Sequence, residues 1–168
     1  MNIPILEKLF NRRKRLDSYT YYQWTLLPSK DRLSILLLQT EWMLFQALLL
    51  GISIDQRLLT AVAEARRVAS GCTTNTKIIQ MARRKALDVF FENGGHTSLK
   101  KQKYLNGCTV AYLCLCIADD AMYETMNRLL PGHINGSIYY DLLRMGSILK
   151  ESPLSKWIDE NDTVSITH

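Results

Sequence analysis

Residues that break helices are scarce in this chain of 168 residues, which contains four prolines and eight glycines. The alternation of apolar and polar residues that marks strands is also missing, so a sheet is not expected. Internal repeats and low-complexity tracts are absent as well. Because 47% of the residues are hydrophobic, global disorder is excluded. The sequence therefore predicts an all-α protein that is long enough to bury its own core.

Long uninterrupted apolar runs are missing too. Polar residues break the apolar stretch 33–50, and the stretch 108–118 is shorter than the roughly 20 residues that a membrane-spanning helix needs. The first ten residues include Pro4, Glu7 and Lys8 and lack the pattern of a secretory signal. Residue 2 is Asn2, whereas N-myristoylation requires glycine there. We therefore expect any membrane contact to be peripheral.

Cysteine and histidine are rare, with four and three residues. The cysteines do not form the framework of a small disulfide-rich domain, and we expect all four to be reduced, buried and intracellular. They are Cys72, Cys108, Cys114 and Cys116. The last two are two positions apart on a predicted helix and point about 200° apart, which keeps them from sharing a metal ion. Neither a metal nor another cofactor is expected.

Catalytic motifs are also missing. Gly94 and Gly95 lack the Lys and Ser/Thr of a phosphate-binding loop. Cysteine and histidine could form a nominal nucleophile and base, but none of these residues lies in a recognisable motif. The possible pairs are Cys72 or Cys108 with His96 or His133. We therefore predict that the protein is not an enzyme.

Capping residues and glycines divide the chain into predicted helices. Ser29 is the expected cap of the second helix, and Ser53 and Gln56 form a capping box for the third. Thr74 or Asn75 is expected to start the fourth helix, and Thr97 or Ser98 to cap the next one. Asp119-Asp120 is expected to cap or kink the chain into a further helix. The second helix is apolar nearly all round, so we expect it to be the central one. The predicted helices cover residues 5–15, 30–50, 54–70, 75–92, 98–118, 119–130 and 134–149.

These helices are predicted to form two packed bundles that make one compact unit. Residues 1–70 form the first bundle and residues 71–150 the second, or middle, bundle. Residues 151–168 form an acidic tail that we expect to be frayed.

Charge is distributed unevenly along the chain, whose net charge is +5. Residues 1–59 contain 8 basic and 5 acidic side chains, residues 60–118 contain 9 and 3, and residues 119–168 contain 4 and 8. The middle of the chain is therefore basic and its end acidic. This segregation favours a polyanionic partner, self-association, or both.

The basic side chains form clusters, which are the candidate binding site. A contact with phosphate requires only a positive charge on a side chain long enough to touch it. Each single cluster could also be a basic helix face that contacts only solvent. Three lysines near a predicted helix start oppose the helix dipole, which points to a functional basic surface. The predicted surface comprises Arg66, Arg67, Lys77, Arg83, Arg84, Lys85, Lys100, Lys101 and Lys103, and a secondary cluster comprises Arg12, Arg13, Lys14 and Arg15.

An aromatic run lies beside the secondary cluster and has two interpretations. Its side chains could stack on nucleic-acid bases, or they could pack across two helices. Packing is favoured because no aromatic residue is interleaved with the other basic clusters. The run comprises Tyr19, Tyr21, Tyr22 and Trp24.

The order of features in residues 51–130 resembles a known family. Arg66-Arg67 ends a helix before Gly71, Arg83-Arg84-Lys85 forms a compact cluster on the next helix, and a glycine–histidine turn at Gly95-His96 follows. Then comes a helix that begins polar and becomes apolar and cysteine-containing, over residues 101–118. This pattern is similar to the N-terminal part of orthomyxovirus matrix proteins, the influenza type or a Thogoto-like one.

The resemblance implies a viral matrix protein that self-assembles into a layer beneath the envelope and bridges acidic membrane lipid and viral ribonucleoprotein or RNA. It implies that Arg83, Arg84 and Lys85 belong to a region linked to RNA binding and nuclear import. Arg66 and Arg67 would lie near a second patch, which contacts membrane and neighbouring copies. The influenza Cys/Cys/His/His stretch has no counterpart after Asp119, which removes any inference of zinc.

The same resemblance implies a location at the inner face of the virion envelope. In the host cell it implies the cytoplasm, the nucleus and the cytoplasmic face of the membrane. The alternative hypothesis is an α-helical viral RNA-binding or host-antagonist protein that never forms a shell.

Overall fold

The structure is a computed structural model that describes residues 22–24, 26–72, 75–101, 105–129, 153, 156–157 and 159–160. Within residues 105–129, side chains are described up to residue 126. The predicted helices over residues 5–15 and 134–149 lie outside these residues. The described part is built from helices and contains no strand, which confirms the all-α class.

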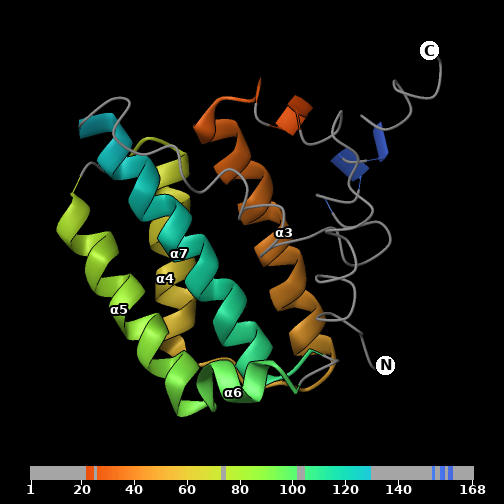
Figure 1. Cartoon of the computed structure of the whole chain (residues 1–168). Helices are drawn as coiled ribbons and strands as arrows, with labels where there is room; N and C mark the ends of the chain where they lie inside the picture. The colour runs from red at the N-terminus through yellow and green to blue at the C-terminus, as the bar shows by residue number, and fades with distance from the viewer. Residues whose placement is uncertain are drawn as a thin grey trace.

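Four long helices and one short helix form most of this part, and short helical pieces occur at residues 22–24, 26, 153, 156–157 and 159–160. The four long helices and the short one are α3 (Ser29–Leu49), α4 (Gln56–Ala69), α5 (Thr76–Glu92), α6 (Gly95–Leu99) and α7 (Gly107–Leu129). In Figure 1, α3 lies at one side of the arrangement and α5 at the other, with α4 and α7 between them. The short α6 crosses the end of the bundle where α5 finishes.

The helix starts differ from three of the predicted caps. Helix α3 begins at Ser29 itself, whose hydroxyl donates to the Glu124 carboxylate on α7 at 2.5 Å instead of capping α3. Helix α4 is capped by Asp55, whose side chain accepts from the Arg57 amide, so the predicted capping box of Ser53 is wrong. A carboxylate directly before the first turn satisfies the free amide and leaves Ser53 exposed.

Helix α6 begins at Gly95, so the predicted cap at Thr97 or Ser98 is also wrong. Gly94 before it has φ 104°, a conformation that glycine adopts without strain, and this lets the chain reverse directly after α5. By contrast, Asn75 caps α5 as expected, because its side chain accepts from the Lys77 amide.

Helix α7 runs unbroken from Gly107 to Leu129, which corrects the prediction that Asp119-Asp120 starts or kinks into a new helix. Both aspartates lie inside the helix, and Asp119 pairs with Arg83 on α5. The ion pair with Arg83 explains why Asp119 lies inside α7 and not at a helix start.

The central helix is α7. The prediction that the helix over residues 30–50 is the central one is therefore wrong. Helix α7 packs against α3, α4, α5 and α6, and its residues 113–118 are all buried. Helix α3 buries Leu33, Leu36 and Ala47 but leaves Leu38 and Phe45 more than half exposed. Helix α3 is apolar nearly all round, but only one of its faces packs into the core.

The buried residues form one cluster that includes side chains of α3, α4, α5 and α7. The predicted boundary between two bundles falls in the turn between α4 and α5, and these two helices pack directly against each other. From the predicted tail, Trp157 contacts the fully buried Trp24 edge to face, with ring centroids 5.0 Å apart. Most of the tail lies outside the described residues.

Candidate polyanion-binding surface

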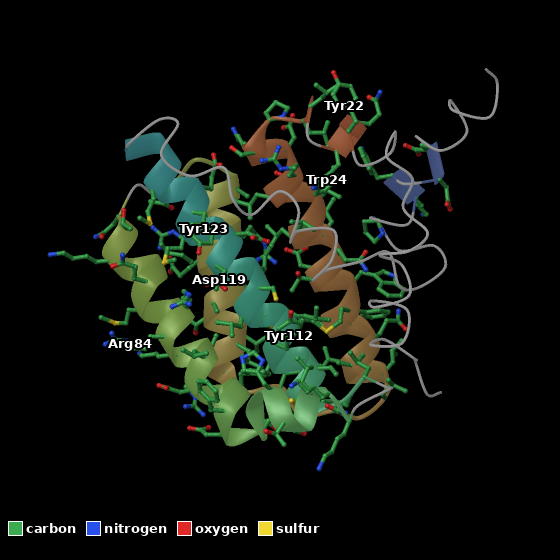
Figure 2. All side chains as sticks on the ribbon, viewed as in Figure 1. Tyr22, Trp24, Arg84, Tyr112, Asp119 and Tyr123 are labelled. Atoms are coloured by element: carbon green, nitrogen blue, oxygen red, sulfur yellow. The ribbon has the colours of Figure 1, made fainter. Side chains whose placement is uncertain are left out.

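Helix α5 carries the candidate site because only one of its faces is buried. Ile79, Ala82, Ala86 and Val89 recur at helical spacing and pack into the core. The basic side chains of this helix therefore point toward its other faces. In Figure 2, Arg84 projects from the outer side of α5 away from the bundle.

A cationic groove lies beside α7 on this surface. Its volume is about 460 Å³. Three of the predicted cations line it together, which agrees with the helical spacing of residues 77, 83 and 84. The lining residues are Lys77, Gln80, Met81, Arg83, Arg84 and, from α7, Met122.

A smaller hollow adjoins this groove on the α4 side. Its volume is about 190 Å³, and it shares Lys77 and Met81 with the groove. Most of its wall is apolar, while Lys77 and Lys85 bring two ammonium groups to it. Its lining residues are Thr60, Glu64, Lys77, Ile78, Met81, Ala82 and Lys85.

Acidic partners divide the predicted cations into two groups. Arg66 binds Glu41 on α3, and its Nε lies 2.8 Å from a carboxylate oxygen of that residue. Arg67 lies 3.6 Å from Glu64 one turn earlier on α4. The guanidinium of Arg83 binds Asp119. These three positive charges are therefore largely balanced within the molecule.

The second group comprises Lys77, Arg84 and Lys85, which are all exposed. Within the part of the chain that the structure describes, none of their side chains forms an ion pair or hydrogen bond with an acidic residue. Their charges are therefore available to an anion from outside. All three belong to α5, and each lines the groove, the hollow or both.

Lys100 and Lys101 lie beyond the end of α5 that is opposite Lys77. Lys100 is the C-cap of α6 and Lys101 follows it, whereas Lys77 lies in the first turn of α5, about 20 Å from that helix's far end. The predicted helix start at these lysines is wrong, because they follow the C-terminus of a helix, where the dipole favours cations. Lys100 and Lys101 therefore do not oppose a helix dipole.

The remaining predicted cations lie outside the described residues. These are Lys103 and the secondary cluster Arg12, Arg13, Lys14 and Arg15. Of the aromatic run, Trp24 is fully buried and Tyr22 is 57% exposed. Packing is therefore confirmed for Trp24.

Gln80, Met81 and Met122 of the groove were not predicted from the sequence, nor was Asp119 as the partner of Arg83. Met81 and Gln80 lie one turn after Lys77 on α5, so helical spacing could have placed them on the same face. Asp119 is 36 positions from Arg83, and no local pattern indicates that the two meet. Only the packing of α5 on α7 brings them together.

All four cysteines are free thiols. Cys108, Cys114 and Cys116 are buried, but Cys72 is exposed, which corrects the prediction that all four are buried. Cys72 follows Gly71 in the turn after α4, where few neighbours cover it. Burial raises the pKa of Cys114 and of Cys108, so both stay protonated thiols and poor nucleophiles.

The described residues contain neither a metal-binding cluster nor a membrane-spanning helix. No cluster of three or more His, Cys, Asp or Glu side chains there could hold a metal ion. None of the helices in that part has both the length and the apolar character needed to cross a bilayer.

Comparison with known proteins gives no relative. The chain matches no protein-family model, and no curated protein and no solved structure is significantly similar to it. The resemblance to orthomyxovirus matrix proteins therefore stays a prediction.

Proposed function

We propose that the chain is a non-enzymatic structural protein of the viral matrix type. It binds acidic membrane lipid and viral ribonucleoprotein or RNA through the basic surface of α5, and it self-assembles into a layer at the inner face of an envelope. In the host cell it acts in the cytoplasm, in the nucleus and at the cytoplasmic face of the membrane.

One observation carries this proposal: Lys77, Arg84 and Lys85 lie together on α5 without an acidic partner among the described residues. A surface cation that already has a carboxylate partner gains little from a phosphate, because it exchanges one anion for another. An unpaired cation gains the full contact and releases the counterions of the phosphate. The three side chains therefore form the part of the predicted surface that fits a polyanion best.

Flotation of the protein with vesicles tests the proposal. Arg84→Ala with Lys85→Ala removes two unpaired charges, and Arg66→Ala with Arg67→Ala is the matched control that removes two paired ones. A cation near an anionic bilayer contributes about 1 kcal/mol, so the first variant is expected to bind roughly 30-fold more weakly and the control about as well as the wild type.

Two results would count against the proposal. Equal losses in the two double variants would show that the groove has no special role. A wild-type protein that is indifferent to anionic lipid content and to added salt would remove the membrane function, because contacts between exposed charges weaken with ionic strength.

The second candidate is an α-helical RNA-binding or host-antagonist protein that forms no shell. The same groove favours it, because Lys77 and Arg84 could follow the phosphates of RNA without reading the bases. An RNA-binding assay with Arg83, Arg84 and Lys85 changed to Ala, run beside light scattering, separates the candidates. Large assemblies that form with lipid favour the matrix, whereas tight RNA binding by a discrete oligomer favours the second candidate.

A further inference from the structure

Helix α3 carries a second apolar row, of which Leu38, Phe45 and Leu49 point away from the core, while Ile35 at its start also packs against the core. The row comprises Ile35, Leu38, Trp42, Phe45 and Leu49, at successive spacings of three, four, three and four residues. This is the spacing of a coiled-coil seam. Leu38 is 54%, Phe45 58% and Leu49 67% exposed, while Ile35 and Trp42 are half-buried.

The row lies opposite the face that α3 presents to the molecule. The core face consists of residues such as Leu33, Leu36 and Ala47, about half a helical turn away from the row. Helices α4 and α7 pack against α3, and Figure 1 places both on one side of it. Of α4, α5, α6 and α7, none lies against the other side.

We propose that this row packs against the same row of a second copy of the chain, with the two α3 helices antiparallel and Trp42 at their centre. The row is nearly symmetrical about Trp42, since Leu38 and Phe45 lie four and three positions from it and Ile35 and Leu49 seven positions. An antiparallel copy therefore sets Leu38 against Phe45 and Ile35 against Leu49. This is the self-complementary contact that a two-fold axis requires.

Charge favours a second copy over an anionic partner. Residues 35–49 include one charged side chain, Glu41, which Arg66 already binds. Two such rows therefore meet without repulsion between like charges. A nucleic acid or an acidic bilayer would find no cation within this row to attract it.

The exposed area fits a weak dimer. Leu38, Phe45 and Leu49 are each more than half exposed and leave on the order of 300 Å² of apolar surface per copy. With Ile35 and Trp42, a symmetrical pair buries roughly 900 Å², which is typical of weak association. A weak contact strengthens by avidity once many copies share one surface.

This inference rests on the proposed function for its biological role, because a layer needs contacts between copies. The contact itself uses α3, whereas the proposed polyanion site uses α5. The two can therefore be tested separately.

Sedimentation of the whole chain over roughly 1 μM to 1 mM measures the dimer. Phe45→Gln is compared with Phe91→Gln, a matched control, because Phe91 on α5 is 56% exposed. We expect Phe45→Gln to raise the dimer Kd by roughly tenfold or more, since each dimer loses two contacts at its centre. Phe91→Gln should leave the Kd unchanged, and circular dichroism should show both variants folded.

Cross-linking tests the antiparallel arrangement, with Cys72→Ser as the background because Cys72 is exposed. A mixture of Leu38→Cys and Phe45→Cys proteins should oxidise to mixed dimers faster than either protein alone, since each residue faces the other type across the axis.

Three results overturn the inference: a wild type that stays monomeric, equal weakening by both phenylalanine variants, or a monomer whose Leu38→Cys thiol is shielded from a soluble reagent. The last result would assign the row to a segment of the same chain. Dimerisation that survives in Arg84→Ala with Lys85→Ala while vesicle binding is lost would show that the α3 contact is independent of the α5 site.

Discussion

At the residue scale, Arg57 joins the start of α4 to the end of α5. Its guanidinium lies 2.9 Å from Asp55, the cap of its own helix, and 2.5 Å and 3.0 Å from the two oxygens of Glu92. Side-chain hydrogen bonds from Arg57 lower the pKa of Asp55 and the pKa of Glu92. All three groups are partly exposed, so their contribution to stability is modest.

Acid should weaken this link. Because both carboxyls have a pKa below their ordinary values of 3.8 and 4.5, they stabilise the fold above those values. That contribution is lost as the pH falls through the lowered folded pKa values. Urea unfolding near pH 6 and near pH 3 should therefore show a smaller acid-induced loss in Arg57→Gln than in the wild type.

The control for this test is Arg84→Gln, which removes an exposed cation that has no acidic partner among the described residues. It should keep the acid dependence of the wild type. If Arg57→Gln also keeps it, the ion pairs with Asp55 and Glu92 do not contribute to the acid sensitivity.

At the element scale, the start of α7 depends on a reciprocal cap. The side-chain oxygen of Asn106 accepts from the amides of Cys108 and Thr109, and the Thr109 hydroxyl accepts from the Asn106 amide. Free amides at a helix start need such acceptors. Since α7 is the central helix, this cap supports the element on which the others pack.

Replacing the cap should therefore lower stability. Asn106→Ala removes the acceptor for two amides and is expected to lower the free energy of unfolding by about 1 kcal/mol. Asn106→Asp keeps an acceptor and should stay within about 0.5 kcal/mol of the wild type. Chemical denaturation measures both variants, and equal losses would mean that α7 does not depend on this cap.

At the scale of the whole molecule, one core connects all four long helices. Ile117 of α7 is fully buried within it. The chain contains three tryptophans. Trp42 lies on α3, Trp24 lies shortly before its start, and Trp157 contacts Trp24. Their fluorescence therefore reports on the α3 side, whereas far-ultraviolet circular dichroism reports on every helix.

If the core unfolds as one unit, the two signals should follow one transition. Ile117→Ala should lower the free energy of unfolding by about 2–5 kcal/mol and shift both signals together. Ile78→Ala, at a residue that is 41% exposed, should have less than half that effect. Transitions at different denaturant concentrations would instead support two separately stable bundles, divided near residue 70.

The sequence by itself determined the all-α class, the approximate bounds of α3, α4 and α5, and the cationic face of α5, because these follow from helical spacing within a few turns. It did not determine which helix is central, because α3 and α7 are both apolar and only packing decides how many faces are covered. Nor did it show which cations keep an unpaired charge. Arg66 and Arg83 pair with Glu41 and Asp119, 25 and 36 positions away. Only the tertiary structure brings these charges together, since an ion pair depends on distance in space and not on distance along the chain.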